Sequence, residues 1–299
     1  MPVPPIIWET TIVVSDMPQV IWHNLRQKPM LQRIFYVPFW ECPYRCEDCC
    51  VDSWPGRPPK DLEAGEAMLF GLIAAQARHT GHAIALHIYG GEPLMRPRYL
   101  RDFMQRAIGH AGVGKLYLYS TLRPRGIESV VAKVPKGRLR IVVNPDTAND
   151  AVHARMAALD GIAEFYRNPT IFHTGRGRYG ADGYQEAWFE RLLPAALPGR
   201  SCFATASGML INGPHRSVHL CCLPQSPVVG HFNQDPSNVF SAYRRKLETF
   251  HREVRARMRA EGHVHACQVC EQDSAYDSTH HGPLDEATVQ WHPRPQAQS

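Results

Sequence analysis

Three cysteines lie close together in the run Cys42-Pro-Tyr-Arg-Cys46-Glu-Asp-Cys49, with three residues between the first pair and two between the second. Three thiolates can hold three irons of a cubane cluster and leave the fourth iron open. Structural zinc sites and ferredoxin clusters normally have four protein ligands. The triplet therefore predicts a metal cluster that binds a further molecule.

A second short feature, Gly90-Gly91-Glu92-Pro93, follows at the end of a strand-like run. Glycine permits backbone conformations and close approaches that larger residues block. Alone, such a turn is an ordinary strand exit. This turn and the cysteine triplet both follow strands, and in parallel sheets the functional residues lie beyond the carboxyl ends of the strands. The turn is therefore interpreted as part of the same functional site.

Five further cysteines lie in the C-terminal third, and the pair Cys267-Gln-Val-Cys270 has a spacing typical of metal ligands. Four thiolates from one compact region suit a fully ligated [4Fe–4S] cluster or a zinc site, and ligand type alone does not separate these two. The predicted ligands are Cys202, Cys221, Cys267 and Cys270, with Cys222 as an alternative to its neighbour Cys221.

Strand-like and helix-like segments alternate through the first two thirds of the chain. This pattern predicts an α/β fold with a mainly parallel sheet and helices on its outer face. Five such units are too few for a closed eight-fold barrel, so a partial (β/α) barrel is expected. The predicted strands are 34–40, 82–89, 115–120, 139–143 and 170–173, and the predicted helices are 62–77, 98–111, 127–132, 148–166 and 184–193.

The pattern changes after residue 197. A hairpin is predicted over 208–220 with Asn212-Gly213 at its turn, and a long helix from Pro236 to about Ala260. We therefore expect an N-terminal extension (1–33), a partial barrel (34–197), a small C-terminal hairpin and helix module (198–273) and a loosely ordered tail (274–299).

The cysteine triplet after a strand, together with the Gly90–Pro93 turn, resembles the radical S-adenosylmethionine (radical SAM) enzymes over residues 34–272. The resemblance implies that Cys42, Cys46 and Cys49 hold a [4Fe–4S] cluster. Its open iron would bind S-adenosylmethionine, which is cleaved reductively to a 5′-deoxyadenosyl radical. The turn formed by Gly90, Gly91, Glu92 and Pro93 would receive the methionine amino group.

Other cofactor contacts implied by the resemblance lie at strand ends. Ser120 and Asn144 are candidates for the ribose, although each could equally cap a helix. Arg176 could contact the cofactor or a carboxylate, or be a simple surface charge. Asp48 replaces a residue that is often aromatic in the family, so adenine stacking is expected from Tyr44 or Tyr89 or to be weaker.

The C-terminal cysteines resemble the twitch module, a shortened relative of SPASM, and the layout is most similar to the 2-deoxy-scyllo-inosamine dehydrogenases. This implies one auxiliary [4Fe–4S] cluster. With nine cysteines in the chain and seven assigned, Cys50 and one of Cys221 and Cys222 remain. Cys222 or Cys50 could donate a hydrogen atom to a substrate radical, while the alternative is a small buried residue beside a ligand.

The leading hypothesis is radical oxidation of a secondary alcohol on an aminocyclitol or sugar-like metabolite, with the auxiliary cluster as electron acceptor. His87 and His173 are candidate bases, and the catalytic base is otherwise unassigned. Alternatives are an epimerase or cross-linking enzyme acting on a ribosomal peptide or sugar, and a non-enzymatic iron–sulfur or zinc protein. The cysteine triplet argues against the last alternative, because an iron–sulfur protein that only carries electrons needs no iron with an open coordination position.

The chain has 299 residues, a formal charge of +5, 44% hydrophobic and 20% charged residues, which is ordinary for a folded globular protein. The modest charge gives little support for nucleic-acid binding. The sequence has no recognisable signal peptide or membrane span, and many cysteines, so a cytoplasmic protein is expected. The expected partners are a small-molecule substrate, with a peptide as alternative, and a flavodoxin or ferredoxin-type reductant.

Overall fold

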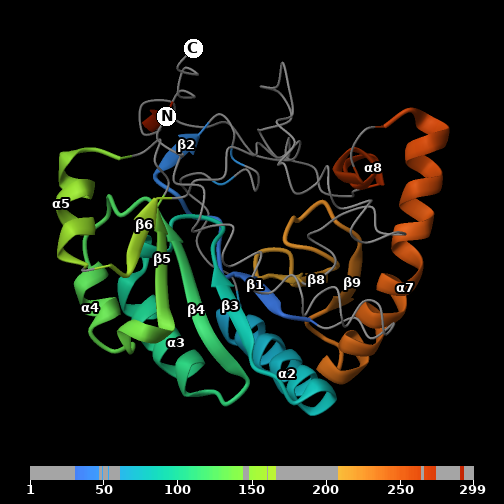
Figure 1. The fold of residues 1–299 in the computed structure, drawn as a ribbon, viewed down its shortest axis with the longest axis horizontal. Coiled ribbons are helices and arrows are strands. Elements are labelled where there is room, and N and C mark those ends of the chain that lie inside the picture. Colours follow the sequence, from blue (N-terminus) through green and yellow to red (C-terminus); the bar gives the residue numbers. More distant parts are fainter. Residues whose placement is uncertain are drawn as a thin grey trace, which may run out of the picture.

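The computed structural model describes residues 31–46, 49, 53, 61–143, 148–159, 161–165, 208–263, 266–273 and 290–292. These residues form a mixed α/β fold around one eight-stranded sheet with the order β6-β5-β4-β3-β1-β7-β8-β9 (Figure 1). The α/β prediction with a partial barrel is confirmed, because the parallel strands form an open array with helices packed against it.

The first six strands in this order, from β6 across the sheet to β7, are parallel to their neighbours. The last two, β8 and β9, extend the sheet by antiparallel pairing. The strands are β1 (Arg33–Val37), β3 (Ile84–Ile88), β4 (Val113–Ser120), β5 (Leu139–Val143), β6 (Ala163–Phe165), β7 (Gly208–Asn212), β8 (Ser217–His219) and β9 (Val228–His231). A separate parallel pair joins β2 (Tyr44–Cys46) to β10 (Gln290–His292).

Helices alternate with the parallel strands as expected and cover one face of the sheet, whereas α8 follows α7 and lies beside it (Figure 1). They are α2 (Leu62–Thr80), η1 (Pro93–Met95), α3 (Pro97–Gly109), α4 (Ile127–Val131), η2 (Lys136–Arg138), α5 (Asp150–Ala158), α7 (Pro236–Glu261) and α8 (Ala266–Asp273).

Side chains alternate between the two faces of the sheet, as the period of a strand requires. One set packs with the helices in the main hydrophobic core, for example Ile34, Leu86 and Leu118. The other set lies on the inner face, where the cross-strand row Phe35, His87 and Tyr117 runs over β1, β3 and β4. The inner face is thus aromatic and partly polar rather than aliphatic.

The predicted helix over 148–166 is wrong in its second half. Helix α5 begins after Asn149, whose side chain accepts a hydrogen bond from the Val152 amide at 3.0 Å, and it ends at Ala158. Gly161 has a φ of +75°, which an L residue in a helix does not adopt. The chain then forms β6 beside β5. The predicted strand 170–173 and helix 184–193 lie outside the described residues.

The predicted hairpin and long helix of the C-terminal region are confirmed as β7–β8 and α7. Asp235 caps α7 by accepting hydrogen bonds from the amides of Ser237 and Asn238, and Pro236 occupies its first turn. β7 pairs with β1, so the sheet continues from the barrel strands into the hairpin. The domain boundaries remain a prediction.

Helix α7 is tied to this junction by Tyr243, whose buried hydroxyl donates to the Gly208 carbonyl at 3.1 Å. We expect Tyr243→Phe to lower the free energy of unfolding by about 1 kcal/mol, because the Gly208 carbonyl loses a buried partner. Urea unfolding of both proteins measures the difference. Ser241→Ala, on the exposed side of α7, is the control and is expected to change stability by less than about 0.5 kcal/mol; equal effects of the two changes would contradict this assignment.

Among the helices that the structure describes, none has both the length and the apolar character needed to cross a lipid bilayer.

Candidate functional site

The cysteine triplet follows β1 at the carboxyl edge of the parallel sheet. Cys42 and Cys49 are half-buried, and the side chain of Cys46 lies outside the described residues. The Cys49 sulfur accepts a hydrogen bond from the Ser53 amide at 3.4 Å, and the Ser53 hydroxyl donates to the Gly90 carbonyl at 3.0 Å. The two motifs predicted from the sequence are therefore in contact through Ser53.

The Gly90–Gly91 turn packs directly on the segment that precedes Cys42. The Gly91 amide donates to the Phe39 carbonyl at 3.1 Å, and the Glu92 amide donates to the Glu41 carbonyl at 2.9 Å. Gly90 has a φ of +121°. A Cβ on Gly91 would lie 2.1 Å from the Glu41 carbonyl oxygen. Both positions therefore require glycine, one for conformation and one for space.

Gly91→Ala is expected to lower the free energy of unfolding by about 1–3 kcal/mol, because backbone at Glu41 must move to admit the methyl group. Gly109→Ala is a matched control, since a Cβ there meets nothing within 4 Å at the end of α3. Its stability should be unchanged or slightly higher. Chemical denaturation distinguishes the two, and equal stability of both variants would show that the Gly91 contact is not tight.

Glu92 holds the turn from its side chain as well. One carboxylate oxygen accepts from the Leu94 amide at 3.0 Å and the Ser120 hydroxyl at 2.7 Å. The other accepts from the Thr121 amide at 2.7 Å and the Thr121 hydroxyl at 2.6 Å. Burial raises the pKa of Glu92, and these four hydrogen bonds oppose the rise. The carboxylate thus joins the exits of β3 and β4.

Ser120 was predicted to contact the cofactor, and its role there remains a prediction. Its hydroxyl donates to Glu92 and accepts from the Leu122 amide at 2.9 Å, which gives it a structural role at the strand end. Ser53 and Thr121 were absent from the predicted site residues. The polar pair Ser120-Thr121 at the end of a strand was a usable signal, whereas nothing in the sequence singled out Ser53.

The two tyrosines predicted for adenine stacking lie in different surroundings. Tyr44 is buried, with the Arg123 guanidinium 5.4 Å from its ring centre, and burial raises its pKa. The Tyr89 hydroxyl donates to the Cys222 carbonyl, and its ring meets Phe35 edge-on at 5.9 Å. Tyr89 therefore joins the exit of β3 to the cysteine turn after β8.

That turn carries two of the C-terminal cysteines. Cys221 is buried and Cys222 is half-buried. The hydrogen bond with Cys222 and burial raise the pKa of the Cys221 thiol. The turn is closed by Ser226, whose hydroxyl accepts from the Cys221 amide at 3.1 Å and donates to the Leu223 carbonyl at 2.8 Å. Cys221 and Cys222 are thus held in a fixed loop.

Comparisons with known proteins rest on the three-dimensional structure, because no family model and no curated protein matches this sequence. The crystal structure of BtrN in complex with AdoMet and 2-DOIA aligns over 75% of this chain and 89% of its own, with a TM-score of 0.50 and 15% identity. The fold is that of BtrN. A second structure, SeMet BtrN in an open conformation, aligns over 74% of this chain and 87% of its own, with 14% identity and a TM-score of 0.45.

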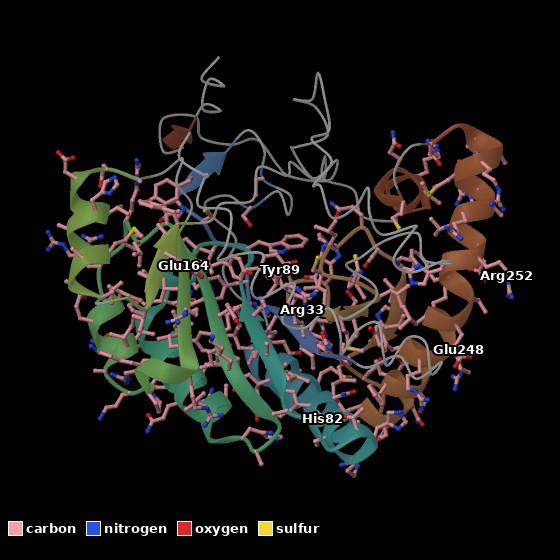
Figure 2. The ribbon with its side chains drawn as sticks, in the orientation of Figure 1. Arg33, His82, Tyr89, Glu164, Glu248 and Arg252 are labelled. Carbon is pink, nitrogen blue, oxygen red and sulfur yellow. The ribbon has the colours of Figure 1, made fainter. Side chains whose placement is uncertain are left out.

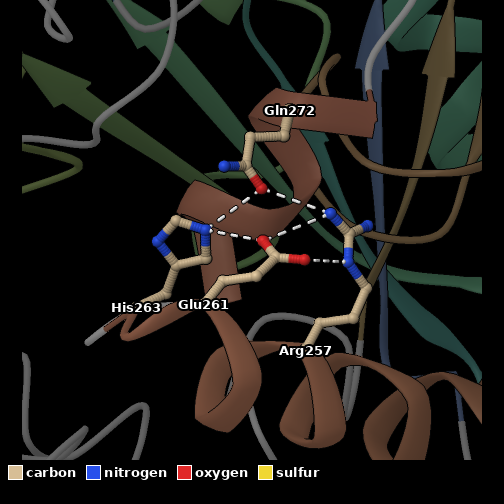
Figure 3. Close-up of polar contacts among 4 residues, drawn as sticks. All are labelled: Arg257, Glu261, His263 and Gln272. Atoms are coloured by element: carbon tan, nitrogen blue, oxygen red, sulfur yellow. Dashed lines mark hydrogen bonds and ion pairs between the residues drawn. The ribbon is translucent and has the colours of Figure 1, made fainter.

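Helix α8, at the C-terminal end of this BtrN-like fold, contains Cys270, which is half-buried, and Cys267, whose side chain lies outside the described residues. A polar network fastens α8 to α7 (Figure 3). The Gln272 side-chain oxygen accepts from Arg257 at 3.2 Å and from His263 at 3.0 Å, while Glu261 accepts from Arg257 at 2.9 Å and from His263 at 2.9 Å. The network therefore helps to fix α8, which carries Cys267 and Cys270, against the end of α7.

Among the described residues, no group of three or more histidine, cysteine, aspartate or glutamate side chains is arranged to hold a metal ion. Several predicted ligands fall outside that description, so the proposed ligand sets remain predictions despite the BtrN fold. The predicted site residues outside the described side chains are Cys46, Cys50, Asn144, Arg176, Cys202 and Cys267.

Proposed function

We propose that this chain is a radical SAM enzyme that oxidises a secondary alcohol of an aminocyclitol or sugar-like metabolite. The observation that carries the proposal is the contact, through Ser53, between the Cys49 loop and the Gly90 turn at the carboxyl edge of β1 and β3. It occurs in a fold shared with BtrN, which was solved with AdoMet and 2-DOIA.

The donor set at this edge fits the proposed cluster. Cys42 and Cys49 present half-buried thiols on a loop that leaves β1, and thiolates are the ligands that iron–sulfur clusters take. Cys42, Cys46 and Cys49 would hold the cluster, and the turn from Gly90 to Pro93 would receive S-adenosylmethionine. When bound, the cluster supplies the electron that cleaves S-adenosylmethionine to a 5′-deoxyadenosyl radical, with a flavodoxin or ferredoxin-type protein as reductant.

The chain's own residues make this turn rigid. Both carboxylate oxygens of Glu92 accept hydrogen bonds, from Leu94, Ser120 and Thr121. The side chain therefore fixes the backbone of the turn and does not project into the proposed S-adenosylmethionine site. Gly90 and Gly91 let the turn pack tightly on the segment 37–41, because a larger side chain at either position would collide with it. A fixed turn of this kind favours orientation of a bound molecule over adjustment to it.

Oxidation of the alcohol removes two hydrogens: a carbon-bound hydrogen atom to the deoxyadenosyl radical, and a hydroxyl proton to a base, with one electron left over. An auxiliary [4Fe–4S] cluster held by Cys202, Cys221, Cys267 and Cys270 would accept that electron. The Tyr89–Cys222 hydrogen bond supports this role, because it joins the β3 exit directly to the loop of Cys221.

His87 is a poor candidate for the base. Its ring is buried, and burial together with the charge of Arg33 holds the pKa of His87 well below its ordinary value. An imidazolium would therefore be strongly disfavoured there. His173, the other candidate, lies outside the described residues.

The proposal is tested with 2-deoxy-scyllo-inosamine carrying deuterium at the carbon that would become a ketone. We expect one deuterium in each 5′-deoxyadenosine formed and a product that has lost one deuterium and one hydrogen relative to the substrate. A product of inverted configuration in which hydrogen has replaced the deuterium would establish epimerisation instead. Zinc in place of iron at the C-terminal cysteines would contradict the electron-acceptor role.

A further inference from the structure

Among the buried polar side chains on the inner face of the sheet, His87 and Asn212 have hydrogen-bonding atoms without a partner in the described part of the chain. His87 lies on β3 and Asn212 at the end of β7, and β1 lies between these strands. Neighbouring strands are roughly 5 Å apart, so the two strands are separated by about 10 Å. Two residues of this inner face are labelled near the centre of Figure 2: Arg33, which lies on β1, and Tyr89, which follows the end of β3.

His87 is held in one orientation. Its ring stacks on Tyr117 at 4.5 Å with an interplanar angle of 7° and lies 4.6 Å from the ring of Phe35. Its Nδ1 is 3.1 Å from the Tyr119 hydroxyl. Its Nε2 is buried and has no hydrogen-bond partner among the residues that the structure describes. The imidazole is thus fixed on three sides and unsatisfied at one nitrogen.

Asn212 is fully buried, with no exposed surface. The backbone beside it is fixed by pairing with Val37 and by the Gly213 amide, which donates to the Val37 carbonyl at 2.8 Å. Neither the side-chain nitrogen nor the side-chain oxygen of Asn212 has a partner within the described part of the chain. Buried amides are almost always hydrogen-bonded, so this one requires an explanation.

Between the two polar groups the inner face is apolar. Val37, Trp40 and Leu210 are buried in one hydrophobic cluster there, and Phe35 and Tyr89, which are half-buried, pack against it. A mainly apolar surface with a few oriented polar groups is typical of small-molecule sites. Since Tyr89 is followed directly by Gly90, this surface adjoins the turn proposed to receive S-adenosylmethionine.

His219 shows what a structural histidine looks like on this face. It is equally buried and lies opposite Leu210 in the strand register. Its Nε2 is 2.7 Å from the Ser217 hydroxyl and its Nδ1 is 2.9 Å from the Ser226 carbonyl, so both nitrogens are satisfied within the protein. His87 and Asn212 differ from His219 because each has at least one hydrogen-bonding atom without a partner among the described residues, which a ligand could supply.

We propose that His87 and Asn212 are substrate-binding residues that hydrogen-bond the hydroxyl groups of a cyclitol or sugar ring packed against the half-buried rings of Phe35 and Tyr89. This inference rests on the proposed function, because it places the alcohol substrate beside the Gly90 turn. Both side chains are neutral when they bind, and a hydroxyl can donate to or accept from either one. Tyr119 acts through His87 as a positioning residue.

The test is calorimetric titration of the reconstituted full chain, with S-adenosylmethionine and without reductant, using 2-deoxy-scyllo-inosamine, myo-inositol and D-glucosamine as probes. We expect at least one probe to bind the wild-type protein. Asn212→Leu should weaken it about tenfold or more while the midpoint of thermal unfolding stays equal or rises, because an unpaired buried amide is replaced by an apolar group of similar volume. A residue with only a structural role would lose stability instead.

His87→Phe keeps the ring stack and removes both nitrogens, so it should also weaken the probe about tenfold. Ser241→Ala, far from this face on the exposed side of α7, is the control and should bind as the wild type does. Failure of all three probes to bind, or unchanged affinity in Asn212→Leu, would overturn the inference. Since no reductant is present, this result is independent of 5′-deoxyadenosine release, which tests the proposed function separately.

Discussion

Cys42→Ser is expected to abolish the release of 5′-deoxyadenosine and to lower the iron content of the reconstituted chain from about eight to about four atoms, if each of the two sites holds a four-iron cluster. Serine is a poor ligand for iron in such clusters, and two remaining thiolates hold a cubane weakly. Iron and sulfide analysis and chromatography of the products measure both effects. The same substitution at Cys49 is expected to give the same result, since Ser53 links that sulfur to the Gly90 turn.

Cys270→Ser provides the contrast: it should also remove about four irons, but it should still release 5′-deoxyadenosine while forming no oxidised product, because only the electron acceptor is lost. Ser241→Ala, on the exposed side of α7, is expected to retain full iron content and activity. Wild-type iron content with undiminished 5′-deoxyadenosine release in Cys42→Ser would contradict the assignment of the triplet.

Glu92→Leu is expected to have the largest effect on stability, lowering the free energy of unfolding by about 3–5 kcal/mol. The carboxylate accepts four hydrogen bonds, and leucine would leave the buried amides of Leu94 and Thr121 and two hydroxyls without their acceptor. Most single substitutions cost less than this. Chemical denaturation measures the loss, with Glu63→Gln on the exposed side of α2 as the control of unchanged stability.

A double-mutant cycle with Thr121→Val tests whether Glu92 acts through this contact. Valine removes the hydroxyl that lies 2.6 Å from the carboxylate and keeps the shape of the side chain. If the two groups stabilise each other, the double variant should lose about 1 kcal/mol less than the sum of the two single losses. Strictly additive losses would show that the Glu92–Thr121 contact contributes nothing.

Local patterns were enough to predict much of the fold. The strand-like run 139–143 and the helical pattern that starts at Pro236 predicted β5 and α7, because each depends on neighbours in sequence. The prediction of a helix over 148–166 was wrong after residue 158, because Gly161 has a positive φ and the residues that follow it pair with β5 as strand β6. The pairing of β7 with β1 could not be predicted, since it joins residues 175 positions apart.

The candidate site also has a part that the sequence predicts and a part that only the structure shows. The triplet and the Gly90–Gly91 turn are contiguous motifs, and the structure brings their loops together. The four partners of Glu92 and the unsatisfied atoms of His87 and Asn212 depend on which side chains face each other across strands. Only the three-dimensional arrangement shows whether a buried histidine resembles His219, with both nitrogens satisfied, or His87.

The most direct measurement is anaerobic incubation of the reconstituted chain with S-adenosylmethionine and dithionite. The proposed function predicts 5′-deoxyadenosine and methionine in equal amounts from the wild-type protein, and none above background when Cys42, Cys46 and Cys49 are all replaced by alanine. A wild-type protein that carries its full complement of iron and sulfide and still releases no 5′-deoxyadenosine would contradict the radical SAM assignment.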